Sequence, residues 1–104
     1  MAAALSKRDT DVYVSAATVW ELSIKQATGR LDFPIELLDE TLEEMQITSL
    51  PVTVAHAVAA GRLPVHHRDP FDRMLIAQAQ VEGLVLMTED SAMNHYDVRI
   101  FGRA

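Results

Sequence analysis

Residues 69–88 have the sequence DPFDRMLIAQAQVEGLVLMT, and this stretch decides the fold class. Asp69 is a typical N-cap residue, and the proline that follows it has the backbone angle that begins a helix. Apolar residues at helical spacing predict that the helix runs over Pro70–Glu82. Gly83 is expected to end it, because glycine adopts the left-handed conformation found after helices. The continuously apolar segment Leu84–Thr88 then predicts a strand that is buried on both faces, as in a parallel sheet.

Outward from this stretch, strand and helix signals alternate along the chain. Strands are predicted at Asp11–Ser15, Ile47–Leu50 and Val98–Phe101. Helices are predicted at Ala16–Thr28, at Pro34–Met45 and from a Thr53 cap to about Ala60. The alternation indicates an α/β protein with a central parallel sheet covered by helices on both faces, a three-layer α/β/α fold. Because no repeat or linker interrupts it, residues 1–104 are expected to form a single domain.

The composition is that of an ordinary small globular protein. Of the 104 residues, 49% are apolar and 23% are charged. No apolar run approaches the roughly 18 residues that cross a bilayer, and the N-terminus does not have the charge order of a secretory signal. A cytoplasmic location with no membrane association is therefore expected. The absence of cysteine excludes disulfides, thiolate zinc sites and cysteine nucleophiles.

The net charge of −6 leaves two interpretations open. The negative charge opposes direct binding to a polyanion, because affinity for phosphates normally rests on Lys and Arg. In the first interpretation, the charge serves only to keep a small domain soluble. An acidic protein can still act on nucleic acid if clustered carboxylates hold a divalent metal that the phosphate then meets.

Acidic residues follow the predicted strands where such a cluster is expected. In parallel sheets, ligands bind beyond the carboxyl ends of the strands. Glu21 lies in the helix after the strand Asp11–Ser15, and Asp90 directly follows Leu84–Thr88. Asp72 lies in the first turn of the helix that leads back to Leu84. Magnesium or manganese would relieve the repulsion between these carboxylates and would activate water for attack on a phosphodiester.

The same acids also have an interpretation without function. Asp and Glu are favoured in the first turn of any helix, because they accept from free N–H groups and stabilise the helix dipole. Asp69 and Asp72 are both expected there for that reason alone, and Asp90 is acceptable as a turn residue. The spacing therefore does not decide between a metal site and ordinary helix capping.

Three blocks of sequence resemble those of one protein family. Residues 12–25, VYVSAATVWELSIK, resemble the second strand and following helix of VapC-type PIN domains. Residues 66–79, HHRDPFDRMLIAQA, are similar to the Asp-Pro-Phe-Asp-Arg segment of that family, and residues 84–90, LVLMTED, to its Thr-x-Asp strand end. The order and spacing of the blocks match, and the resemblance covers nearly the whole chain.

The resemblance implies a metal-dependent endoribonuclease that cuts single-stranded or looped RNA and serves as the toxin of a toxin–antitoxin pair. It implies that the carboxylates of Glu21, Asp72 and Asp90 bind Mg²⁺ or Mn²⁺ and act in catalysis. Accessory roles are implied for Asp69, Thr88 and Arg73, the last by pairing with a carboxylate or phosphate. The implied partners are the RNA substrate, a VapB-like antitoxin and a second copy in a homodimer.

The start of the chain departs from the family pattern. PIN domains open with an apolar strand that ends in Asp and lies in the middle of the sheet, and nothing before Asp11 matches it. Met1–Arg8 instead resembles the end of the helix that follows this strand. We therefore expect an incomplete, N-terminally truncated PIN domain that lacks the first strand and one metal ligand. A fragment or misplaced start, a decayed gene, or a gap closed by the flanking strands or by a second chain would each explain it.

This departure supports an alternative function, a non-catalytic PIN module that binds an antitoxin or dimerises. Val58 and Leu63, with the alanines near them, are candidates for such an interface. Trp20 lies on the apolar stripe of its helix and is expected to pack in the core, with base stacking as the less favoured role. A flavodoxin-like or receiver-like domain is less favoured, because the chain lacks the acidic pair and late lysine that such a domain needs.

Overall fold

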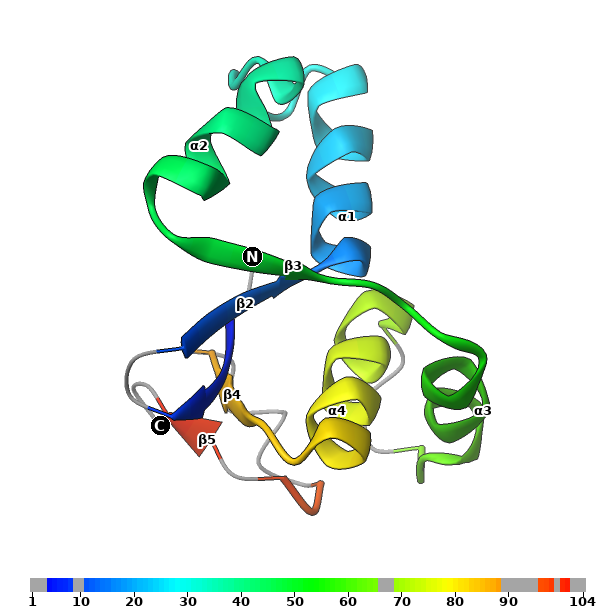
Figure 1. Ribbon diagram of the computed structural model, residues 1–104. Helices are drawn as coiled ribbons and strands as arrows, with labels where there is room; N and C mark the ends of the chain where they lie inside the picture. Colours follow the sequence, from blue (N-terminus) through cyan, green and yellow to red (C-terminus); the bar gives the residue numbers. More distant parts are fainter. Residues whose placement is uncertain (1–3, 9–10, 66–68, 89–95, 99, 102–104) are drawn as a thin grey trace.

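The computed structural model describes residues 4–8, 11–65, 69–88, 96–98 and 100–101 (Figure 1). The strands in these ranges are β1 (Ala4–Arg8), β2 (Asp11–Ser15), β3 (Ile47–Leu50), β4 (Val85–Met87) and β5 (Ile100–Phe101). The α-helices are α1 (Ala16–Ala27), α2 (Leu38–Glu44), α3 (Val54–Arg62) and α4 (Pro70–Glu82), and a short 3₁₀ turn, η1 (Ile35–Leu37), precedes α2.

The strands form one sheet in the order β3-β2-β1-β4-β5. β2 pairs with β3 in parallel, and β4 pairs with β5 in parallel. Figure 1 shows α1 and α2 together on one side of the β2–β3 strands, with α3 and α4 on the other side. The predicted α/β class, with helices on both sides of a sheet that contains parallel pairs, is confirmed.

The central strand β1 runs antiparallel to both of its neighbours. Leu5 is opposite Tyr13 of β2 and also opposite Leu86 of β4. The prediction that Met1–Arg8 resembles a helix end was therefore wrong for Ala4–Arg8, and the expected gap in the sheet is filled by the chain itself. Two strands with unpaired inner edges offer hydrogen bonds that outweigh the helix preference of Ala, Leu, Lys and Arg.

The caps of α4 are those that the sequence predicts. The carboxylate of Asp69 accepts a hydrogen bond from the N–H of Phe71 at 2.9 Å, and Pro70 is the first helical residue. At the other end, Gly83 has φ of 68° and ψ of 38°, the left-handed conformation. These two ends fix the helix directly before β4, so α4 and β4 form a helix-to-strand unit.

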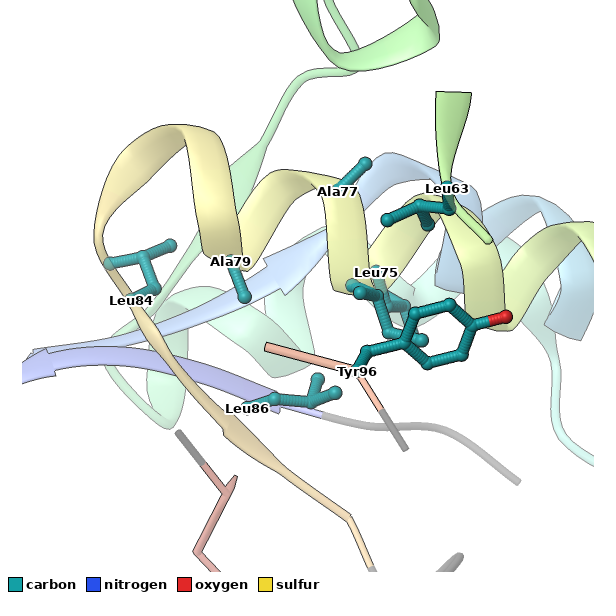
Figure 2. Close-up of a cluster of buried hydrophobic side chains, with 8 residues drawn as sticks. Leu63, Leu75, Ala77, Ala79, Leu84, Leu86 and Tyr96 are labelled. Atoms are coloured by element: carbon teal, nitrogen blue, oxygen red, sulfur yellow. The ribbon is translucent and has the colours of Figure 1, made fainter. Parts of the chain in front are cut away.

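The hydrophobic core lies where α4 faces β4 and the segment before α4 (Figure 2). Leu75 and Ile76 of α4 and Leu86 of β4 are fully buried. Leu63 and Tyr96 close the cluster on its other sides. Each large apolar side chain buried in this way contributes roughly 1.5–3 kcal/mol, so the core fixes the position of α4 against the sheet.

Among the helices that the structure describes, none combines the length and apolar character needed to cross a membrane.

Candidate functional site

The register of β1 shows which strand ends lie together. Ala4 is opposite Val14 near the carboxyl end of β2 and opposite Met87 at the carboxyl end of β4. β2 and β4 therefore run in the same direction with β1 between them, and their carboxyl ends lie at one edge, about 10 Å apart at two strand spacings. Leu50 of β3 and Phe101 of β5 are paired at the same edge. This edge, named the carboxyl edge below, is where an α/β protein binds its ligands.

Helix α1 begins directly at the carboxyl edge. Ser15, the last residue of β2, is fully buried, and its hydroxyl accepts a hydrogen bond from the N–H of Ala17 at 3.0 Å. This cap removes one of the free N–H groups at the start of the helix and fixes its direction away from the strand. Glu21 follows in the second turn of α1 and is half-buried.

The first turn of α4 lies beside α1. The rings of Trp20 and Phe71 meet edge to face, with their centroids 5.2 Å apart and an interplanar angle of 65°. Glu21 and Asp72 are the next residues along the chain after this aromatic pair. The contact therefore brings together the two backbone segments that carry these candidate acids.

Asp69 has a defined structural role at this place. Its Oδ1 atom accepts from the N–H of Phe71 and, at 3.2 Å, from the N–H of Asp72. The carboxylate thus caps α4, and this is the purely structural role that was expected for an Asp at the start of a helix. By capping the helix, Asp69 also holds the backbone of Asp72 in place.

The third predicted metal ligand, Asp90, lies outside the described residues. Thr88, the predicted accessory hydroxyl, directly follows β4 at the carboxyl edge and is half-buried. Within the described ranges, no group of three or more His, Asp or Glu side chains is placed so that it holds a metal ion. The site formed by Glu21, Asp72 and Asp90 therefore stays a prediction. Its donors are carboxylate oxygens, which are the ligands that Mg²⁺ and Mn²⁺ prefer.

Arg73 joins the carboxyl end of α3 to α4. Its Nη2 atom donates to the carbonyl oxygens of Ala60 at 2.9 Å and Leu63 at 3.1 Å, and Nη1 donates to that of Pro64 at 3.2 Å. A cation at this point also stabilises the negative end of the α3 dipole. These bonds to backbone carbonyls make Arg73 a link between the two helices.

A second polar cluster lies deep between α3 and α4. His56 is fully buried, and its Nδ1 accepts from the N–H of Thr53 at 3.0 Å. The ring proton must then be on Nε2, which lies 2.7 Å from a carboxylate oxygen of Glu82. The amide of Gln78 approaches Nδ1 at 3.4 Å and donates to the carbonyl of Pro51 at 3.2 Å. Both ring nitrogens are engaged, so His56 stabilises the helix pair and offers no nitrogen to a ligand.

The main correction at the site concerns Trp20. Its side chain is 63% exposed, so the prediction that it packs in the core was wrong. It lines an apolar groove of about 540 Å³ between α1 and α4. The other lining residues are Ala16, Ala17, Ile24, Val52, Pro70, Phe71 and Met74. The apolar stripe predicted on α1 is present, but part of it faces this groove and not the core.

Sequence comparison agrees with this architecture. A protein family model described as the PIN domain matches residues 1–99, which include all the helices that the structure describes, the strands β1 to β4 and the aromatic pair. A search of curated proteins found no match to the chain.

Proposed function

The chain belongs to the PIN domain family, which includes nucleases, and from that premise we propose that it is a Mg²⁺- or Mn²⁺-dependent endoribonuclease of the VapC toxin type. The observation that supports this most is the ring contact between Trp20 and Phe71. Trp20 directly precedes Glu21 on α1, and Phe71 directly precedes Asp72 on α4. Two acids distant in sequence are thereby carried on neighbouring segments of α1 and α4. The strand that leads towards the third, Asp90, ends at the same carboxyl edge.

The proposed roles rest on the place of each residue in the fold and on the chemistry of its side chain. Glu21, Asp72 and Asp90 would hold the metal through their carboxylate oxygens. When bound, the metal supplies a Lewis acid that orients the phosphodiester and lowers the pKa of an attacking water. Asp69 keeps the first turn of α4 in register, and the Thr88 hydroxyl lies at the edge where the phosphate would arrive. Arg73 fixes α4 against α3, so that Asp72 is held by a rigid helix.

The proposed biological setting is a toxin–antitoxin pair in the cytoplasm. We assign to the protein a VapB-like antitoxin and a second copy in a homodimer as partners. Exposed apolar side chains of α3, Val54 and Val58, offer surface for one of them. Leu63, the other residue that the sequence indicated for such a surface, is buried in the core instead.

A second candidate function is supported by the composition of β1. The strand has the sequence ALSKR and occupies the centre of the sheet without a carboxylate. A PIN domain whose central strand supplies no acid has fewer metal ligands and is expected to bind metal more weakly. The alternative is therefore a non-catalytic PIN module that binds an antitoxin or dimerises.

Calorimetric titration with Mn²⁺ tests the site, and cleavage of single-stranded RNA tests the function. Asp72→Asn and Asp90→Asn are expected to weaken Mn²⁺ binding by roughly tenfold or more and to lower cleavage in parallel. The matched control is Glu43→Gln, which removes an exposed acid of α2. Equal Mn²⁺ affinity in all four proteins would refute the site. If the chain binds metal or partner without cutting RNA, the second candidate function replaces the first.

A further inference from the structure

We propose that the groove between α1 and α4 is a nucleobase subsite, in which Trp20 stacks on one base of a single-stranded RNA next to the bond that is cut. The inference rests on the proposed function, because it places this base beside the acids assigned to the cleavage reaction. It names a residue that binds and selects substrate, in addition to the residues that hold the metal.

The geometry of the aromatic pair suits a stacked base. Phe71 meets Trp20 edge to face at 5.2 Å, and this contact holds the indole in a fixed orientation. The Trp20 side chain nevertheless stays 63% exposed, so the contact with Phe71 leaves much of the indole surface free. A fixed and accessible aromatic surface is what single-strand-binding proteins use to stack bases.

The lining of the groove favours a base over a phosphate or sugar. All of its lining residues are apolar, from Ala16 and Ala17 through Met74, and none carries a charge. A phosphate would need Lys or Arg, whereas a nucleobase offers a neutral ring that an apolar wall can cover. The volume of about 540 Å³ is in the range of small-molecule sites. With so few polar groups in the lining, the subsite is expected to accept every base and to bind purines best, because they stack most strongly.

The groove lies between the two helices that carry two of the proposed metal ligands. Trp20 directly precedes Glu21, and Phe71 directly precedes Asp72. A nucleotide whose base lies on Trp20 therefore has its phosphate close to the helix segments that carry both acids.

The chain has a single tryptophan, so its fluorescence reports on this groove alone. The full chain is titrated with a non-cleavable 2′-O-methyl oligoribonucleotide, and separately with an abasic oligonucleotide of equal length and charge. Stacking on Trp20 predicts that the first quenches the fluorescence and that the second does not. Equal quenching by both would overturn the inference.

Two variants extend the test to affinity, measured by anisotropy of a labelled oligonucleotide. Trp20→Leu is expected to weaken binding on the order of tenfold, the effect of losing one stacked base. Trp20→Phe keeps a ring and is expected to retain most of the affinity. Met45→Ala, at a residue that is 62% exposed and does not line the groove, is the matched control. Unchanged affinity in folded Trp20→Leu would overturn the inference.

Failure of the subsite is distinguishable from failure of the proposed function. If metal-dependent RNA cleavage is intact in Trp20→Leu and oligonucleotides leave the fluorescence unchanged, the subsite is refuted while the function stands. If the oligonucleotide quenches Trp20 but no protein cuts RNA, the function is refuted and the base-binding groove stands. A shift of Trp20 emission with protein concentration alone, in step with dimer formation by sedimentation, would show that a second copy covers the groove and would overturn the inference.

Discussion

The hydroxyl of Tyr96 donates a hydrogen bond of 2.8 Å to the carbonyl oxygen of Pro64. The same oxygen accepts from Arg73 at 3.2 Å, so a loop carbonyl is held by two donors from distant parts of the chain. Tyr96 is buried against Leu63 and Leu75, and its ring and its hydroxyl thus hold the segment before α4 from two sides (Figure 2).

Replacement of Tyr96 by Phe removes one of these two donors and leaves the ring in place. We expect a loss of about 1 kcal/mol in the free energy of unfolding, measured by urea denaturation, because the Pro64 carbonyl keeps its bond to Arg73. Tyr13→Phe is the control, since no hydrogen bond to the Tyr13 hydroxyl is found among the described residues. Equal losses in the two variants would contradict the role of the Tyr96 hydroxyl.

Gly83 and Gly61 allow the effect of a Gly→Ala substitution to be compared between a helix C-cap and a position within a helix. An added Cβ meets no atom within 4 Å at either position, but Gly83 has φ of 68° and Gly61 lies inside α3. Gly83→Ala is therefore expected to lower the free energy of unfolding by about 1 kcal/mol, and Gly61→Ala to raise it by about 0.5–1 kcal/mol. Thermal unfolding of both variants checks the signs. A stabilised Gly83→Ala protein would show that the left-handed C-cap is absent.

The buried His56 is expected to be among the most sensitive polar positions. His56→Ala removes a fully buried ring, a bond to the N–H of Thr53 and a bond to Glu82, so we expect a loss of about 2–4 kcal/mol in the free energy of unfolding. Glu82→Gln keeps an acceptor at a side chain that is 41% exposed, and about 1 kcal/mol or less is expected. Denaturant titration compares the two. Similar losses in both would mean that the ring is not held as described.

Asp69 allows the capping role to be separated from a metal role. Asp69→Ser keeps an N-cap oxygen and is expected to stay within about 0.5 kcal/mol of the parent in unfolding free energy, whereas Asp69→Ala loses about 1 kcal/mol. Because the Asp69 carboxylate is engaged with two backbone N–H groups, Asp69→Ser is also expected to keep its Mn²⁺ affinity. Calorimetric titration with Mn²⁺ measures this affinity. A loss as large as that of Asp72→Asn would make Asp69 a metal ligand as well.

The helix-to-strand unit of α4 and β4 could be predicted from local signals alone. Asp69, Pro70 and Gly83 each act through the conformation of their own backbone, and such effects are visible in sequence. The ranges of β2, β3 and α1 were predicted nearly as well for the same reason. The rule that strand ends gather at one edge places the start of α1, which follows β2, but it does not place Asp72, because α4 follows a loop.

Other features depend on contacts that no local pattern encodes. Residues Ala4–Arg8 have the composition of a helix, and they become a strand because two neighbours pair with them. For Trp20, helical periodicity identifies an apolar stripe but does not say whether the rest of the chain covers it. The bond between Tyr96 and Pro64 joins residues far apart in sequence and has no sequence signal.

The central position of β1 determines at what stage of synthesis the sheet can be completed. β1 forms a local hairpin with β2, but its pairing with β4 joins segments far apart in the sequence and requires Val85–Met87 to be synthesised first. On the ribosome, β1 and β2 stay separate from β4 until Val85–Met87 have emerged. Until then the carboxyl edge, at which β2 and β4 end together, is not assembled.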